Sequence, residues 1–262
     1  MQNRLFEMLD SLVEEVGEEN MVQVITDSAS AYVLAGSKLE NKRSRLYWSP
    51  CAAHLIDLML QDIGGGKTFK DTIDKTRKVT VYIYRHCVLL STFRKFTGGK
   101  ELTRAGVTRF ATSFLTLKRF QELKQPLRAL FASKDWAEST FVSTSEGKLV
   151  ENIVLGDVNF WKAIKYCLSG VVPIFKVLRL MDGDAKPAMG YIYEAMDRAK
   201  EQIKESFNGV ESRYRPIWEK IDRRWDMQLH RPLHAAGYYL NPRYIYYFTT
   251  YINIIYYSSI ND

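Results

Sequence analysis

Asp27 is the residue whose position points most directly to chemistry. It follows the short β-branched run MVQVIT and precedes a stretch with helical spacing, so we expect it at the carboxyl end of a buried strand. Open α/β sheets bind ligands and metal ions at that edge, where a carboxylate can coordinate Mg²⁺. The alternative is that Asp27 or Ser28 simply caps the next helix. One carboxylate cannot hold the paired metals that cleave phosphodiesters, because those need several acids from different elements.

Two other patterns superficially suggest a phosphate-binding loop and a zinc site. The segment GGGKT at residues 64–68 lacks the earlier glycine of a phosphate-binding loop, since Gln61 stands there, and it follows a predicted helix. We interpret it as a helix stop and linker. Cys51 and His54 are separated by two residues, as in some zinc sites, but they enter a predicted helix, and His86 lies in an apolar run. Structural zinc is therefore the less favoured interpretation.

The elements that must position Asp27 are predicted from periodicity. Apolar residues recur at helical spacing from Leu5 to Val16, and the strand MVQVIT follows. A second helical stretch leads to another short strand, LYWSP, and then to the amphipathic helix CAAHLIDLMLQDI. This order of helices and strands within residues 1–63 predicts an α/β layer with at least two neighbouring parallel strands.

Beyond Gly64 the pattern is mainly helical. We expect loops at TGGKELTRAGVT, SKDWAEST, SEGKLVEN and MDGDAKP, a helix from Pro187 to about Phe207, and another around Ile217 to Trp225. The predicted fold is therefore α/β at residues 1–63, followed by a large, mainly α-helical domain at residues 64–243.

The tail at residues 244–262 differs from the rest in composition. It holds six Tyr, five Ile and a single charge, Asp262. As a helix, its uncharged stretch would span about 25 Å, short of the ~30 Å hydrocarbon core of a bilayer. We interpret the tail as an aberrant segment outside the evolved fold rather than a membrane anchor, and we expect no membrane partner.

Composition and charge exclude several classes of protein. Of the 262 residues, 46% are hydrophobic and 26% charged, which is typical of a globular chain and excludes disordered, collagen-like and disulfide-scaffold proteins. Three scattered cysteines and the lack of a signal-peptide pattern indicate an intracellular, reducing compartment.

The net charge of +7 is unevenly distributed. Residues 1–27 hold seven acids and one base, net −6, whereas residues 67–128 hold fifteen bases and four acids, net +11. We call residues 67–128 the basic segment. Its bases alternate with aromatic residues, which indicates either a nucleic-acid surface or amphipathic helices with aromatic cores. These aromatic residues are Tyr82, Tyr84, Phe93, Phe96, Phe110 and Phe120.

Four runs are specific enough to compare with known families. They are VQVITDSASAYVLAGSKLENKRSRLYWSPCAAHLIDLMLQDIG, VTRFATSFLTL, KPAMGYIYEAMDRAKEQI and RRWDMQLHRPLHAAGYYLNPRYIY. Over about residues 1–244, the chain closely resembles plant hAT-superfamily transposase-like proteins. The resemblance implies an RNase H-like catalytic core interrupted by a helical insertion domain, in which three acids bind Mg²⁺ or Mn²⁺ and cut transposon ends.

The resemblance also assigns roles to individual residues. It implies that Asp27 is the second acid of the triad, a metal ligand, and that His54 of Cys51-x-x-His54 lies near the scissile phosphate. Arg109 and Phe110 match an Arg-aromatic pair that handles flanking DNA. We expect further DNA contacts in the basic segment from Arg104, Lys118 and Arg119.

Departures from the family pattern limit these expectations. Ser28 and Ala31 replace two asparagines, and Phe110 replaces a larger tryptophan. We expect the chain to begin after the strand with the first acid and to end before the helix with the third. With one acid of three, we expect no stably bound Mg²⁺ or Mn²⁺ and no transposase activity from this chain alone.

The expected partners follow from the same resemblance. We expect weak, salt-dependent DNA binding, a nuclear location and possible association with full-length relatives. The parent activity would be metal-dependent DNA cleavage and strand transfer. The alternative is a domesticated, non-catalytic module that binds nucleic acid or protein, in which Asp27 serves only the helix start.

Overall fold

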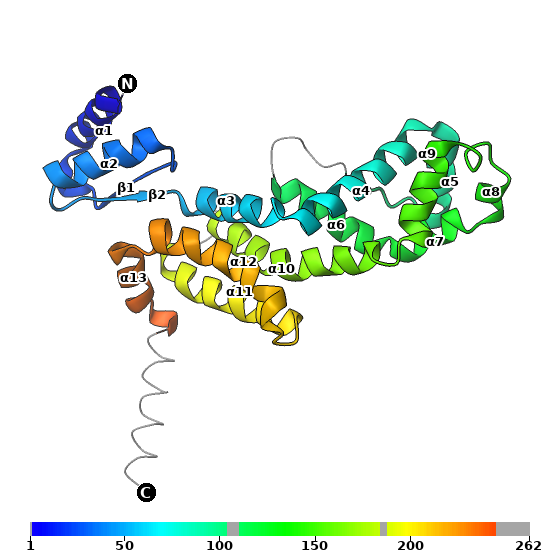
Figure 1. The fold of residues 1–262 in the computed structure, drawn as a ribbon. Helices are drawn as coiled ribbons and strands as arrows, with labels where there is room; N and C mark the ends of the chain where they lie inside the picture. Colours follow the sequence, from blue (N-terminus) through cyan, green and yellow to red (C-terminus); the bar gives the residue numbers. More distant parts are fainter. Residues whose placement is uncertain (1, 104–109, 184–187, 245–262) are drawn as a thin grey trace, which may run out of the picture. The chain divides into compact units, whose positions relative to one another are not determined.

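The computed structural model describes residues 2–103, 110–183 and 188–244 (Figure 1). Within these residues, two short strands near the N-terminus form a parallel sheet, and the other regular elements are helical. The predicted fold class, parallel strands with helices followed by a long helical region, is confirmed.

The N-terminal elements follow the predicted order. Helix α1 (Gln2–Val16) stops before Gly17, whose φ of 87° lies in the left-handed region that glycine adopts readily. Strand β1 (Gln23–Thr26), helix α2 (Ser30–Lys42) and strand β2 (Tyr47–Pro50) follow. The strands pair in parallel from Gln23↔Tyr47 to Thr26↔Pro50, so both predicted strands are confirmed.

Helices α1 and α2 pack against each other over a small apolar core (Figure 1). Its buried members are Leu9, Val13, Ala35, Leu39 and Leu46. At one side of this core the buried guanidinium of Arg43 bonds three acids of the α1 region: Asp10 (2.8 Å), Glu14 (3.1 Å) and Glu18 (2.9 Å). These ion pairs satisfy the buried cation and join the end of α2 to α1.

Helix α2 also lies directly against β2. Gly36 faces the buried indole of Trp48 so closely that a methyl group at Gly36 would lie 2.2 Å from Trp48 Cδ2. Only glycine lets the helix backbone approach the ring at this distance, because any Cβ would overlap it.

Helices make up the rest of the regular structure, together with short turns. In chain order they are α3 (Ala52–Gly64), α4 (Lys67–Arg85), α5 (Cys87–Thr97), α6 (Phe110–Glu122), α7 (Lys124–Phe131), α8 (Lys134–Ala137), α9 (Ser145–Glu151), α10 (Phe160–Met181), α11 (Ile192–Ser206), α12 (Glu211–Arg224) and α13 (Pro232–Tyr239). Asn152–Gly156 and Trp225–Leu229 form π-helical turns, and Glu18–Asn20 and Met189–Tyr191 form 3-10 turns. The GGG linker separates α3 from α4, as predicted.

Two predicted loops contain helices instead. SKDWAEST includes α8 and SEGKLVEN includes α9, because Ser133 and Thr144 cap them by accepting backbone hydrogen bonds at 3.2 and 3.0 Å. Buried Trp136 and Val150 anchor these short helices to the core. Pro187 and residues 245–262 lie outside the described residues.

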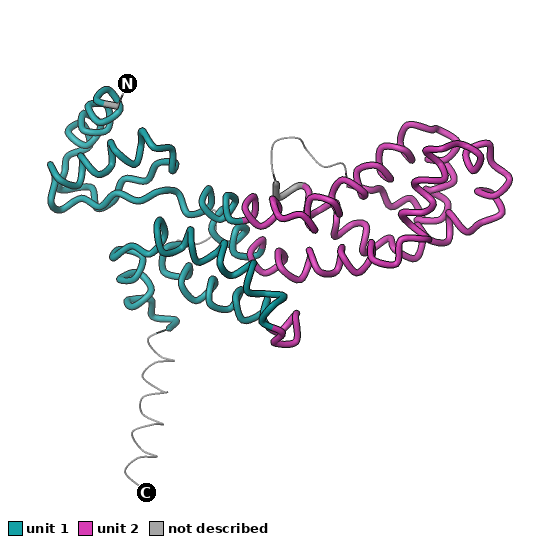
Figure 2. Tube along the Cα trace, viewed as in Figure 1, with its two compact units in different colours: residues 1–59, 176–204, 211–262 teal, residues 60–175, 205–210 magenta. Residues whose placement is uncertain are grey.

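The chain forms two compact units (Figure 2). Unit 1 comprises Met1–Met59, Lys176–Lys204 and Glu211–Asp262, and unit 2 comprises Leu60–Phe175 and Glu205–Val210. These bounds differ from the predicted domains 1–63, 64–243 and 244–262. The C-terminal helices belong with the strands because Trp225–Leu229 lies against β2.

None of the helices in the described part of the chain combines the length and the hydropathy needed to cross a bilayer.

Candidate functional site

Asp27 lies directly after β1, at the carboxyl end of the strand, and its side chain is exposed. Its Oδ1 accepts a hydrogen bond from the backbone N–H of Ala29 at 2.8 Å. Ala29 is itself the N-cap of α2, and no side chain caps that helix. The carboxylate therefore shapes the turn before α2 rather than capping the helix, which differs from the simple cap alternative.

Cys51 and His54 follow the carboxyl end of the neighbouring strand. Parallel pairing places Thr26 opposite Pro50, and the Cys51 N–H extends the ladder by donating to the Thr26 carbonyl at 2.7 Å. His54 is exposed in the first turn of α3. Because both strands end at the same edge of the sheet, Asp27 and the Cys51-x-x-His54 pair share that edge, which we call the strand-end site.

Two linked hydrogen bonds connect the Asp27 turn to the core residue Trp48. The indole N–H of Trp48 donates to Thr26 Oγ1 at 3.0 Å, and Thr26 Oγ1 donates to the Asp27 carbonyl at 2.9 Å. Trp48 is 4% exposed and packed on Gly36, so its position is fixed by the core. The turn that carries Asp27 is thereby tied to the packing of α2 against β2.

Arg231 adds a positive charge to this part of unit 1. Its guanidinium carbon lies 5.7 Å from the centre of the Trp48 ring, within cation–π range. Arg231 could not be identified from sequence, because nothing local to it signals a contact with a strand some 180 residues earlier. The tertiary fold alone brings this cation beside β2.

The donor atoms at the strand-end site can be compared with what a divalent ion needs. Mg²⁺ and Mn²⁺ prefer several oxygen ligands, and phosphodiester cleavage by paired ions needs several carboxylates. Asp27 supplies one carboxylate, with one oxygen already bonded to Ala29. Within the described residues, no group of three or more His, Cys, Asp or Glu could hold a metal ion. This donor set does not fit a resident pair of divalent ions.

The second candidate surface is the basic segment, in which ion pairs reduce the number of free charges. The pairs are Lys75–Asp157 (2.6 Å), Arg85–Glu146, Arg94–Glu101 (2.7 Å) and Arg119–Glu122 (3.0 Å). Asp157 and Glu146 come from outside the segment, so folding adds negative charge that the count of +11 omits. The hydrogen bond from Lys75 lowers the pKa of Asp157 and keeps its carboxylate ionised.

The predicted DNA-binding residues can be followed only in part. Lys118 is exposed on α6, whereas Arg119 on the same helix is half-buried and paired with Glu122. Arg104 and Arg109 lie outside the described residues. Phe110 begins α6, and its side chain also lies outside the described part.

The aromatic residues of the basic segment mostly belong to the core of unit 2. Tyr82, Phe93 and Phe120 are at most 4% exposed. Tyr84 is half-buried and donates from its hydroxyl to Glu101. Buried rings cannot stack on nucleic-acid bases, so for these residues the structure supports the alternative of amphipathic helices with aromatic cores.

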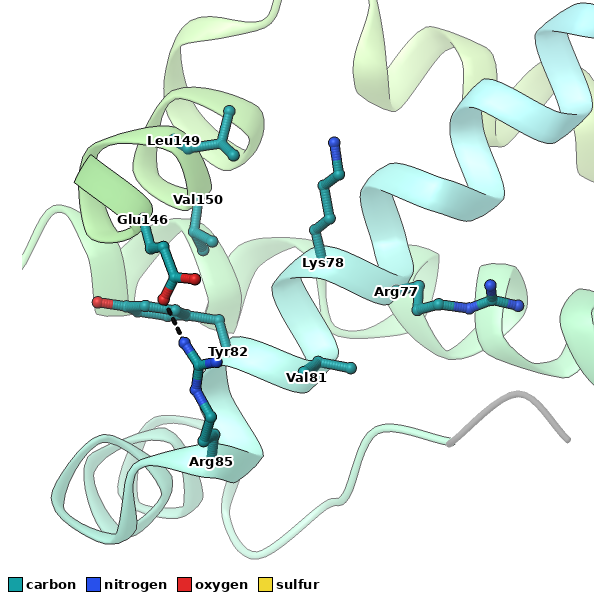
Figure 3. Close-up of a pocket in the computed structure, with 8 residues that line it drawn as sticks. All are labelled: Arg77, Lys78, Val81, Tyr82, Arg85, Glu146, Leu149 and Val150. Carbon is teal, nitrogen blue, oxygen red and sulfur yellow. Dashed lines mark hydrogen bonds and ion pairs between the residues drawn. The ribbon is translucent and has the colours of Figure 1, made fainter. Parts of the chain in front are cut away.

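A groove in unit 2 was not identified from sequence. It lies between α4 and α9 and has a volume of about 330 Å³ (Figure 3). Arg77, Lys78, Val81 and Tyr82 line it from α4, and Leu149 and Val150 line it from α9. The ion pair between Arg85 and Glu146 spans the two helices within the same groove. We call it the α4–α9 groove. In the sequence, the one local indication of this groove is Val81, an apolar residue among the polar positions of α4.

Comparison with known protein families gives a match to the N-terminal part of the chain. Residues 1–79 match a family model described as "Domain of unknown function (DUF659)". The match includes Asp27, Cys51 and His54, and it ends within α4. No curated protein and no solved structure matches the chain.

Proposed function

We propose that this chain is a truncated, transposase-derived protein of the hAT type. Its parent activity would be metal-dependent DNA cleavage and strand transfer. DUF659 domains are commonly found in hAT-like transposase-derived proteins, and residues 1–79 match that domain. The observation that carries the proposal is the strand-end site, where Asp27 and the Cys51-x-x-His54 pair share the carboxyl edge of two parallel strands. This is the edge at which α/β sheets place catalytic groups.

We infer that the chain alone does not cleave DNA. Paired-metal hydrolysis requires ions that stabilise both the attacking and the leaving oxygen, and one exposed carboxylate cannot position two ions. Mg²⁺ or Mn²⁺ would meet Asp27 transiently, so neither ion is a stable cofactor. His54 would then lie at the strand-end site without a catalytic role.

DNA binding is the activity that the chain is proposed to retain. Exposed Lys118, together with bases of the basic segment that form none of the four ion pairs above, supplies charge for phosphate contacts. Such contacts carry no sequence information and weaken steeply with salt, because they release condensed counterions. We propose weak, salt-dependent DNA binding, with a nuclear location and association with full-length relatives as its setting.

Fluorescence anisotropy with a labelled DNA duplex tests this proposal. Affinity should fall linearly with salt on logarithmic axes, and Lys118→Ala should reduce the slope by about one. Lys134→Ala is the matched control, because Lys134 is also exposed but lies outside the basic segment and pairs with Glu138. Binding that ignores salt, or equal losses for both variants, would contradict the proposed DNA surface.

A cleavage assay tests the inferred lack of catalysis. Supercoiled plasmid incubated with the purified chain and Mg²⁺ or Mn²⁺ should stay intact. Nicking that disappears in Asp27→Ala would show that the strand-end site cleaves DNA and would contradict the inferred lack of catalysis.

A second candidate is a domesticated, non-catalytic binding module. The hydrogen bond from Ala29 to Asp27 favours it, since that bond gives the carboxylate a structural task in the turn before α2. Under this function Asp27→Asn, which keeps the acceptor oxygen, should leave DNA or protein binding unchanged. Loss of binding in Asp27→Asn would exclude it.

A further inference from the structure

The α4–α9 groove has an apolar floor and a basic rim. Val81 of α4 and Leu149 of α9 are 54% and 46% exposed, and buried Tyr82 and Val150 line the groove beside them. Arg77 and Lys78 are exposed on α4, and within the described part of the chain neither forms an ion pair. Exposed aliphatic side chains flanked by cations are typical of a groove for an amphipathic helix with acidic residues.

Helix α1 of the same sequence has the complementary surface. The side of α1 next to its α2-facing core residues carries Met8, Leu12 and Val16, each close to half exposed. Their spacing of four residues makes a stripe about 12 Å long on one side of the helix. Glu7 and Glu15 are also exposed on α1, whereas Asp10 is engaged by Arg43.

We propose that the α4–α9 groove binds α1 of a second copy of this chain. The apolar stripe would cover Val81 and Leu149, and the acids of α1 would face Arg77 and Lys78. Charge complementarity supports this occupant, because Glu7 and Glu15 of α1 are exposed and are not among the acids that bond Arg43, and exposed Arg77 and Lys78 line the groove. The volume of about 330 Å³ suits a few inserted side chains from one helix rather than a broad domain surface.

The groove chemistry favours a protein helix over nucleic acid. The Tyr82 ring packs against His86 and Phe141, with centroid distances of 4.7 and 6.4 Å, so its face is not free to stack on a base. Exposed Val81 and Leu149 offer nothing to a phosphate backbone. An aliphatic floor gains free energy by excluding water from another apolar surface.

The proposed contact joins different surfaces of two copies. Such a heterologous interface leaves one free α1 and one free groove at the ends of each assembly, so copies add to one another until a ring closes. Self-association should therefore increase continuously with protein concentration. This inference does not depend on the proposed DNA function.

Sedimentation velocity of the full chain over a wide concentration range tests the proposal. Glu15→Lys and Lys78→Glu should each weaken self-association by about tenfold or more, because like charges then face each other. An equimolar mixture of the two variants should recover association, since the wild-type α1 of one meets the wild-type groove of the other. Leu12→Lys should also weaken it. Met227→Lys, at an exposed apolar site outside both surfaces, is the control.

Each other outcome overturns the proposal. Association that is unchanged in Glu15→Lys and Lys78→Glu would place the interface elsewhere, and a chain that stays monomeric throughout would exclude it. Weakened association without recovery in the mixture would contradict the head-to-tail arrangement. Reduced DNA affinity in Lys78→Glu with unchanged association would assign the groove to nucleic acid. Circular dichroism of each variant confirms folding.

Discussion

Replacement of Gly36 by alanine should disturb the packing that supports the strand-end site. The new methyl group would lie 2.2 Å from Trp48 Cδ2 and 2.3 Å from Cγ. Carbon atoms in good contact stay 3.5–4.0 Å apart, so helix and ring must separate by roughly 1.5 Å. Trp48 cannot rotate away freely because it is 4% exposed and bonded to Thr26.

The expected loss of stability combines two opposing effects. Overpacking a filled core costs about 1–3 kcal/mol, and the severe overlap here indicates the upper end. Alanine gains about 1 kcal/mol over glycine inside a helix. The net loss should be about 2 kcal/mol, which lowers the folding equilibrium constant of unit 1 roughly 30-fold.

Hydrogen exchange of peptides from β2 provides a local readout of this change. In Gly36→Ala, the Cys51 N–H, which donates to the Thr26 carbonyl, should exchange faster. Gly65→Ala is the matched control, because a Cβ there meets only ordinary contacts from 3.5 Å and should change stability by less than about 0.5 kcal/mol. Equal protection of β2 in both variants would refute the reasoning from Trp48.

Three further predictions concern buried or paired groups. Burial raises the pKa of Cys167 to about 12, so in the folded chain at pH 8 this thiol should react with a maleimide far more slowly than Cys51 and Cys87. In urea, where the chain is unfolded, all three thiols should react at comparable rates. Burial lowers the pKa of His234 below its ordinary value of about 6.5, so the unfolded state binds a proton at this residue more tightly than the folded state does. The free energy of unfolding should therefore be unaffected above pH 6.5 and fall below it, and His234→Gln should flatten that pH dependence in urea titrations. The hydrogen bond from Lys75 lowers the pKa of Asp157, which also accepts hydrogen bonds from backbone N–H groups at the start of α10. The ionised Asp157 carboxylate should therefore stabilise the fold above its ordinary pKa near 3.8, and this stabilisation should disappear as pH falls below that value. At pH 7, Asp157→Ala should lower the free energy of unfolding by about 1–2 kcal/mol.

Local patterns predicted the N-terminal region well. The apolar run ending in Asp27, the strand LYWSP and the helix entered by Cys51 all fold as their periodicity indicates, because each depends on neighbours within a few residues. The same pattern placed Asp27 at a strand end. The pattern did not show that the Asp27 carboxylate accepts its hydrogen bond from the Ala29 N–H and not from an N–H inside α2.

Weak local signals account for the errors. Helices α8 and α9 are only four and seven residues long, too short to form without tertiary contacts, so their polar sequences resembled loops. Buried Trp136 and Val150 supply those contacts. The aromatic residues of the basic segment have the same sequence pattern whether they face solvent or a core, and only packing could decide between the two.

The sequence by itself determined the strand order, the position of Asp27 and the opposite charges of α1 and the basic segment, since these depend on residue type and near neighbours. Tertiary structure decided which charges are neutralised and which surfaces are brought together. Lys75 meets Asp157 across 82 positions and Arg85 meets Glu146 across 61, and Arg231 reaches Trp48 from the far end of the chain. Such contacts depend on how distant helices pack, which no window of sequence encodes, because burial of apolar surface favours many arrangements until the whole fold selects one.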